Sequence, residues 1–307
     1  MSFLKFRKTA AVPAPAPDVV AAFVQGYSIE VMPRTAAKVE SFAEILPVGT
    51  RVYIAHLEGT PIEEMVATAA RIAGEGFPVM PHFPARIIPD RATLADWIAR
   101  YQGEAGVDQA LVLAGGIGGA IGEFDNSMQL LDSGLFDKAG FKRLHVAGHP
   151  EGNKDIDPDG GLHNVSEALR WKQGFSERTD AEMAITTQFC FEPGPVIQWA
   201  EGLREAGIAL PVHIGVAGPA KLQTLIKFAI ACGVGPSLSV LQRRAADVTK
   251  LLTPYEPTDF VAALAAHRQA HPDFAITNLH LFPLGGIRAS TDWAAAHGAA
   301  PQKASSP

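Results

Sequence analysis

The sequence has few cysteines, no excess of positive charge and no long apolar run, and each shortage removes a class of protein. Its two cysteines, Cys190 and Cys232, stand in apolar segments without metal-ligand spacing. We therefore expect reduced, packed thiols. A formal net charge of -6 gives no basic field for nucleic acid. No apolar run reaches the roughly 18 residues of a membrane span. Prolines interrupt the stretch after the basic first residues, which excludes a secretory signal, so we expect a cytoplasmic protein.

Several enzyme signatures are missing as well. The chain has no G-x-S-x-G nucleophile elbow and no phosphate-binding P-loop. Its richest glycine segment, residues 115–122, lacks the G-x-G-x-x-G spacing of a dinucleotide-binding turn, so an open doubly wound sheet is the weaker alternative for the fold. Lys172 and Lys221 stand in helical patterns, which leaves a Schiff-base aldolase without an obvious strand lysine.

What the sequence does have is an alternation of short β-rich runs and longer amphipathic stretches. Several of the runs are nearly continuous in apolar residues, as parallel strands covered on both faces are. They lie at residues 27–32, 51–57, 77–82, 108–114, 142–148, 183–190, 210–216 and 276–282. The stretches between them have apolar residues at helical spacing and lie at residues 36–46, 61–75, 91–104, 164–178, 194–206, 218–232 and 286–297. A further helical pair, at about 236–252 and 258–270, precedes the last run.

Eight β/α units in roughly 270 residues match the number and size of a closed (β/α)8 TIM barrel. We therefore predict an α/β protein with a single barrel domain at residues 21–297 and an extra helical segment before the last strand. The Ala/Pro-rich residues 1–20 and the small, polar residues 298–307 are expected to form flexible ends.

In such a barrel the reacting groups lie at the carboxyl ends of the strands. Glu30 is the first candidate, because it stands between Ile29 and Val31 in an apolar strand. Burial without a partner is costly for a carboxylate and raises its pKa toward values that suit proton donation. An ion pair with Arg34 or another cation is the alternative interpretation.

His82 and His149 follow the third and fifth expected strands. Each could be a structural histidine, or the two together could indicate a barrel metallohydrolase. No H-x-H pair follows the first strand and no aspartate closes the last one, so we expect no metal.

Glycine-rich turns at 115–119 and 285–286 bring backbone N–H groups to the barrel mouth. They suit phosphate or a flat ring, although any tight βα turn also needs glycine. Gln188 lies within the apolar segment TTQFCF and must hydrogen-bond with protein or ligand. Phe228 is a core residue by default.

The same residues resemble the methylenetetrahydrofolate reductase family. The similar segments follow in order from strand one to strand eight, over about residues 25–290: YSIEVMPRT, MPHF, ALVLAGG, VAGHPEG, ITTQFCFEP, HIGVAGPAKLQTLIKF and LHLFPLGGI. The resemblance implies a noncovalently bound FAD at the carboxyl mouth. NADH or NADPH would reduce it, and the hydride would pass to 5,10-methylenetetrahydrofolate to give 5-methyltetrahydrofolate, or the reaction would run in reverse.

The resemblance also implies roles for individual residues. Glu30 would be the general acid that assists opening of the five-membered ring. Gln188 would hydrogen-bond the pterin, and Phe228 would pack on the nicotinamide or the aminobenzoate ring. The cofactor would be bound by residues that follow strands two to five: His56, His82, Ala114, Gly115, Gly116, His149, Glu151 and Lys172.

One departure from the family concerns the flavin. Where the family commonly has Arg-Gly-Asp after strand four, this chain has Ala114-Gly115-Gly116. Loss of the negative charge would ease formation of an anionic reduced flavin. It would also weaken folate contacts, unless Glu123, Asp125 or a water takes over. A divergent flavin oxidoreductase with another acceptor, and a noncatalytic folate- or flavin-binding paralogue, are therefore the alternatives. All expected partners are small molecules, and a homo-oligomer could form through the apolar helices at 218–252.

Overall fold

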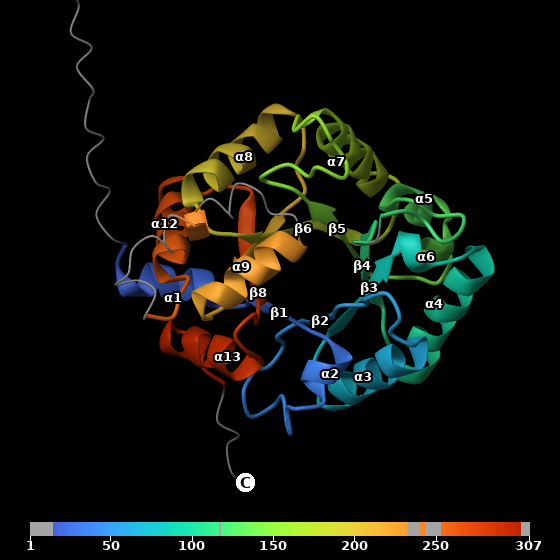
Figure 1. The fold of residues 1–307 in the computed structure, drawn as a ribbon, viewed down its shortest axis with the longest axis horizontal. Helices are drawn as coiled ribbons and strands as arrows, with labels where there is room; N and C mark the ends of the chain where they lie inside the picture. Colours follow the sequence, from blue (N-terminus) through green and yellow to red (C-terminus); the bar gives the residue numbers. More distant parts are fainter. Residues whose placement is uncertain (1–14, 117, 233–239, 243–252, 302–307) are drawn as a thin grey trace, which may run out of the picture.

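The computed structural model describes residues 15–116, 118–232, 240–242 and 253–301. Within these residues, parallel strands close into a barrel in the order β1-β2-β3-β4-β5-β6-β7-β8, and helices surround it (Figure 1). The strands are β1 Ser28–Val31, β2 Val52–Ile54, β3 Val79–Pro84, β4 Gln109–Leu113, β5 Arg143–Gly148, β6 Glu182–Cys190, β7 Val212–Ala217 and β8 Ile276–Phe282. The predicted (β/α)8 TIM barrel is confirmed.

The outer layer consists of helices that bury an apolar face against the strands. They are α1 Pro17–Val24, α3 Ile62–Gly74, α4 Arg91–Ala105, α5 Ser127–Asp132, α6 Leu135–Lys138, α7 His163–Ser176, α8 Pro193–Glu205, α12 Thr258–Ala270 and α13 Ile287–Ala296. Outward strand residues such as Ile29, Val52 and Ile54 join one large core cluster with these helices. Each fully buried side chain of this size contributes roughly 1.5–3 kcal/mol.

The region after β1 differs from the prediction. A helix over residues 36–46 is wrong: α2 spans only Pro33–Ala36, and turns follow it. Arg71 of α3 and Glu75, the residue that follows α3, supply hydrogen bonds to the backbone of this segment. Arg71 donates to the carbonyl of Ala36 over 2.9 Å, and the carboxylate of Glu75 accepts from the Phe42 N–H over 2.6 Å. The chain can therefore leave the helix without orphaning its backbone groups.

Two other segments depart from the expected boundaries, and one expected helix lies mostly outside the described residues. Helices α5 and α6 follow β4, where no helix was predicted. Helix α1 begins at Pro17, inside the segment expected to be flexible, while residues 1–14 lie outside the described residues. The helix expected at 236–252 also lies mostly outside them, whereas the second of that pair is observed as α12.

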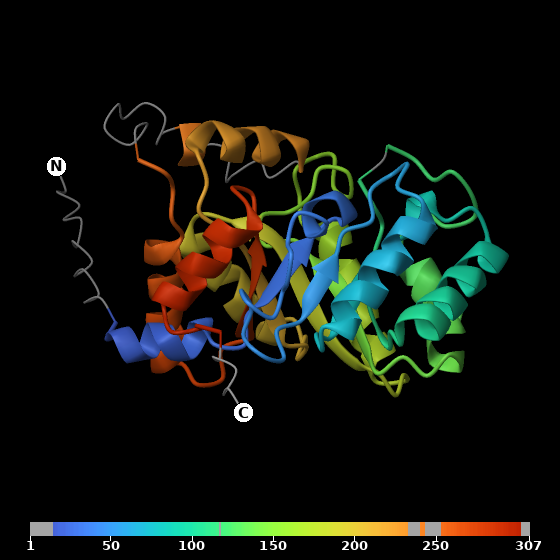
Figure 2. The same cartoon turned by 90° about the horizontal axis from the view of Figure 1, so that it is seen from below.

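The two ends of the barrel are differently covered. Figure 2 shows α2 and α9 (Leu222–Ala231) at the same end, where the strands finish, with α9 lying across that end and α1 near the opposite one. Helix α9 packs its buried Leu222, Leu225 and Ala229 on aromatic residues from the ends of β6 and β8. It therefore forms part of the rim of the carboxyl mouth. None of the helices within the described ranges has the length and apolar character needed to cross a membrane.

Candidate active site at the carboxyl mouth

The inside of this barrel is polar, whereas the interior of a TIM barrel is typically filled by branched aliphatic residues. Because neighbouring residues in a strand face opposite sides, the outward Ile29, Val52 and Ile54 place Glu30 and Tyr53 on the inside. The polar side chains that meet in the interior are Ser28, Glu30, Tyr53, His82, His145, Thr186, His213 and His280. Such groups are tolerated in a core only when they pair with one another or with a ligand.

Glu30 lies at the mouth end of this interior and faces two histidines. Its Oε2 is 3.3 Å from Nε2 of His82 on β3 and 3.7 Å from Nε2 of His280 on β8. The His280 side chain is fully buried, whereas 19% of the Glu30 side chain stays exposed toward the mouth. The partners of Glu30 are thus histidines, and the alternative ion pair with Arg34 is not seen. Neither Nε2 makes a well-directed hydrogen bond to any described residue.

The environment of Glu30 lowers its pKa to about 2. Burial raises this pKa, but the favourable interactions of the carboxylate with the nearby imidazoles of His280 and His82 outweigh burial. The expected upward shift of the pKa is therefore wrong, because the sequence did not reveal the two imidazoles. Burial lowers the pKa of His280, and Glu30 opposes that shift. Glu30 is therefore ionised at neutral pH.

Below Glu30 a hydrogen-bonded group spans the barrel. Oγ of Ser28 lies 2.9 Å from Nδ1 of His280, and the ring of His280 lies 4.3 Å from that of Tyr53. The Tyr53 hydroxyl is 2.7 Å from Nδ1 of His145 and 3.4 Å from Oγ1 of Thr186. These contacts fix the orientation of His280, and His280 in turn contacts the Glu30 carboxylate on the side away from the mouth.

Sequence reasoning missed His280, Tyr53 and His145. His280 alternates with Leu279 and Leu281 in an apolar strand, which is the same pattern that singled out Glu30. A search for single polar residues inside apolar strands, rather than at their ends, would have found it.

Gln188 and Phe228 belong to the same end of the barrel. The pairing of β6 with β7 shifts register between Thr186 and Phe189, which places Gln188 at an irregularity. Gln188 is partly exposed, and its Oε1 accepts from the Phe189 N–H over 3.1 Å. Phe228, on α9, is partly buried against the aromatic cluster at this end. Both side chains therefore remain accessible to a ligand.

The turn after β4 has room where the family carries its acid. Gly115 has a φ of +104°, which a residue with a side chain rarely adopts, and a Cβ added at Gly116 meets no described atom within 4 Å. The Asp125 carboxylate, a candidate substitute for the aspartate at position 116 of the family pattern, already pairs with Arg86 over 3.1 Å. The Arg86 N–H also fixes this turn by donating to the carbonyl of Ala114 over 2.9 Å.

The residues after β2 and β5 that were expected to bind the cofactor mostly make hydrogen bonds within the protein. Nζ of Lys172 donates to the carbonyl of Ala147 over 2.9 Å, and burial lowers its pKa to about 8. Burial, with Lys172 nearby, lowers the pKa of His149 to about 4, and the adjoining Glu151 is partly buried. Nε2 of His56 lies 2.9 Å from the carbonyl of Thr60, although its buried Nδ1 has no described partner.

These residues fit a flat ring better than a diphosphate. The turn at Gly116, where an added Cβ would meet no described atom within 4 Å, and the neutral His149 would leave room for the face or edge of a flavin. Lys172, the cation that a diphosphate would need, already donates a hydrogen bond to the carbonyl of Ala147. Cys232, expected to be packed, is exposed at the end of α9, while Cys190 is buried as expected.

One trio of described side chains lies close enough to share a metal ion. Glu201, His267 and His271 come from α8 and the end of α12, on the outside of the barrel. They do not belong to the mouth, and the expectation of a metal-free mechanism stays a prediction.

The chain matches no protein-family model, but solved structures share its fold. An uncharacterised protein from Clostridium thermocellum, which binds two copies of 5-methyl-5,6,7,8-tetrahydrofolic acid, has a TM-score of 0.52 and 11% identity. The match covers 87% of this chain and 94% of that one.

Two further structures are less similar. The first is a mandelate racemase/muconate lactonizing enzyme from Bordetella bronchiseptica RB50, with a TM-score of 0.43, 13% identity and coverage of 90% and 57%. The second is the carboxyl transferase domain of pyruvate carboxylase from Rhizobium etli, with a TM-score of 0.39, 9% identity and coverage of 90% and 54%. This chain spans just over half the length of each. At such identities the likeness concerns the fold alone.

Proposed function

We propose that this protein is a flavin-dependent oxidoreductase acting on a reduced folate, with methylenetetrahydrofolate reduction by NADH or NADPH as its reaction. The observation that supports this most is the ionised Glu30 at the barrel mouth, held between His82 and His280. Gln188 and Phe228, the other two residues that the family resemblance assigns to substrate, lie at the same end of the barrel. The structural neighbour that binds 5-methyltetrahydrofolate gives a precedent for a reduced folate on this architecture.

Glu30 and His82 would act as one proton-holding unit. Oε2 of Glu30 and Nε2 of His82 are 3.3 Å apart, and these two groups would together handle the proton that ring opening needs. Because Glu30 is ionised at neutral pH, the carboxylate would hold that proton only together with the neighbouring imidazole, and would direct it toward the mouth. The same negative charge stabilises the iminium cation that ring opening creates.

Gln188 and Phe228 would orient the substrate. The Gln188 amide has donors left to offer to a pterin edge, because only its Oε1 is used by Phe189. Phe228 on α9 offers an aromatic face at the rim. A bound flavin supplies the hydride-transfer chemistry, and the open turn at Gly115 and Gly116 is where the chain would lie against its ring.

Glu30→Gln tests this proposal. We expect the folate half-reaction to slow by about 10²–10⁴-fold, because the amide can neither hold the proton nor stabilise a cation. Reduction of the flavin by the nicotinamide should stay nearly unchanged. Anaerobic stopped-flow absorbance of the FAD-reconstituted protein measures both half-reactions, and Glu44→Gln, on an exposed residue, is the matched control.

Three other outcomes of this experiment would contradict parts of the proposal. Equal loss in both half-reactions would assign Glu30 to cofactor binding instead. If methylenetetrahydrofolate reoxidises the reduced wild type no faster than buffer, folate is not the acceptor, as Gly116 in place of the family's acid would allow. A preparation that cannot be reconstituted with FAD removes the flavin and the reaction together.

A further inference from the structure

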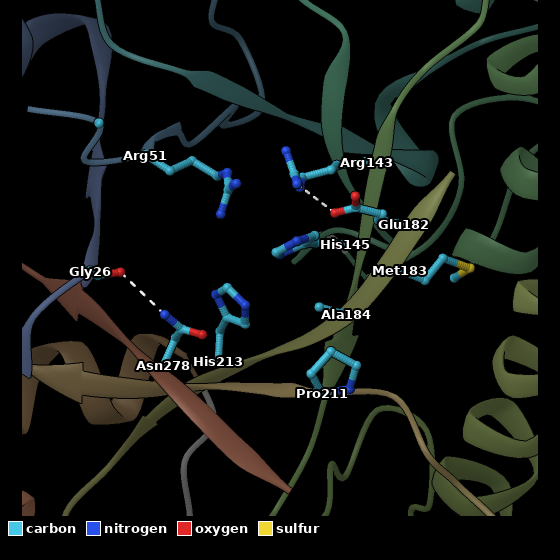
Figure 3. A pocket seen from close by; sticks show the side chains of 11 residues that line it. Gly26, Arg51, Arg143, His145, Glu182, Met183, Ala184, Pro211, His213 and Asn278 are labelled. Carbon is cyan, nitrogen blue, oxygen red and sulfur yellow. Dashed lines mark hydrogen bonds and ion pairs between the residues drawn. The ribbon is translucent and has the colours of Figure 1, made fainter. Parts of the chain in front are cut away.

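A second concave site lies at the opposite end of the barrel. Its cavity of about 600 Å³ is lined by residues that precede or begin the strands, including Arg51, Arg143, Glu182, Pro211 and His213 (Figure 3). A volume of this size is within the range of small-molecule sites. His145 lines this cavity, and its contacts with Tyr53 and Thr186 fill the interior between the cavity and Glu30, so the two openings lie at opposite ends of the barrel.

The side chains that face the cavity carry more positive than negative charge. Figure 3 shows the guanidinium groups of Arg51 and Arg143 directed toward each other across it. Nε of Arg51 donates to Oε1 of Gln109 over 2.7 Å, and no carboxylate of the described chain lies within ion-pair distance of Arg51. Arg143 pairs with Glu182 over 2.5 Å, but 72% of that carboxylate side chain is exposed to solvent. One guanidinium charge is therefore left uncompensated at the cavity.

A buried donor also points to a ligand. His213 is 8% exposed, lines the cavity, and its Nδ1 has no partner within the described ranges. Burial, with the nearby Arg51 and Arg143, lowers the pKa of His213 to about 3, so the ring is neutral. A neutral imidazole can present an N–H, and a buried donor without an acceptor costs about 1–3 kcal/mol.

We propose that the cavity at the amino-terminal end of the barrel binds a small organic anion through its carboxylate or phosphate group. Arg51 and Arg143 would hold the anionic group from two sides, since planar guanidinium groups pair well with both kinds of oxyanion. His213 would donate a third hydrogen bond. Ala184 and Pro211 give the cavity apolar lining for the rest of the molecule, and a cavity of this size exceeds the needs of a bare phosphate ion.

Calorimetric titration of the full chain tests this inference, and its outcome does not depend on the reaction at the mouth. The probes are glycerol 3-phosphate and succinate, with glycerol as the uncharged control and potassium chloride at matched ionic strength. We expect at least one of the two anions to bind and glycerol not to bind. Preference for one anion identifies the group that the site recognises.

Variants with opposite expected effects locate the binding site. Arg51→Gln and Arg143→Gln should each weaken binding by at least about tenfold, because a charge-assisted hydrogen bond is lost. Arg143 is a rim residue, so its variant remains informative if Arg51→Gln does not fold. Glu182→Gln should tighten binding, since it frees Arg143 from a competing carboxylate. Arg170→Gln, on the outside of α7, is the matched control.

The histidine gives an independent readout. Bound anion should raise the pKa of His213 by charge interaction, which the pH titration of its imidazole resonances measures. The proposal is overturned if neither anion binds, or if the wild type, both arginine variants and Glu182→Gln bind with equal affinity.

Discussion

Tyr53 and Tyr101 are both fully buried, but their hydroxyl groups have different surroundings. The Tyr53 hydroxyl contacts His145 and Thr186, whereas the Tyr101 hydroxyl has no partner among the described residues. Tyr53→Phe should lower the free energy of unfolding by about 1–3 kcal/mol, because it leaves buried polar atoms with fewer partners. Tyr101→Phe should leave stability unchanged or raise it, since it removes an unsatisfied O–H.

Urea denaturation of the two variants compares these residues under the same conditions. The pair is matched in size, burial and substitution, so the difference between them isolates the hydrogen bonds. Equal destabilisation would mean that the interior network under Glu30 adds nothing beyond packing.

At the scale of elements, the irregularity in β6 depends on a glycine in β7. A Cβ added at Gly215 would lie 2.5 Å from the carbonyl carbon of Gln188 and 2.6 Å from the carbonyl oxygen of Thr187. Gly215→Ala should therefore push β6 away, displace Gln188 and weaken substrate binding. We expect a loss of stability of about 1–3 kcal/mol, as overpacking in a rigid core produces.

Gly202→Ala provides the control for this substitution. Gly202 lies in α8 with nothing within 4 Å of its added Cβ, so alanine should stabilise the helix by up to about 1 kcal/mol. Thermal unfolding measures both variants, and the affinity for 5-methyltetrahydrofolate measures the displacement of Gln188. If Gly215→Ala keeps both properties, the register shift in β6 does not position Gln188.

The elements predicted from the sequence were those that local pattern determines. All eight strands were found because buried parallel strands are continuous apolar runs, and the order of β/α units then fixes the barrel. The segment after β1 was missed because Arg71 and Glu75, about 35 residues later, satisfy its backbone. The pKa of Glu30 was missed for the same reason. His280 is 250 residues away in the chain and 3.7 Å away in the fold.

On the scale of the whole molecule, the barrel buries several histidines, and the pKa of each of them is lowered. Burial is the largest cause of a lowered pKa at His145, His149, His213 and His280, with neighbouring cations adding to it at the first three. For His149 and His213 the folded pKa is about 4 and about 3, against an ordinary value of 6.5. The fold therefore holds these rings neutral at a pH where the unfolded chain would protonate them.

This difference predicts an early acid transition. Between the folded and the ordinary pKa of each histidine the unfolded chain binds more protons, so stability falls as pH decreases below about 6.5, by up to about 1.4 kcal/mol per pH unit for each ring. Glu30 acts in the same direction but later, between its ordinary pKa of 4.5 and its folded pKa of about 2. As the pH falls, stability should thus decline first because histidines gain protons on unfolding and only later because carboxylates do.

Urea denaturation from pH 8 to pH 5 measures the dependence of the free energy of unfolding on pH. His213→Asn should reduce this slope, and His163→Asn, at an exposed position, should leave it unchanged. A free energy of unfolding that stays constant between pH 7 and pH 5 would show that these rings gain protons within the folded barrel.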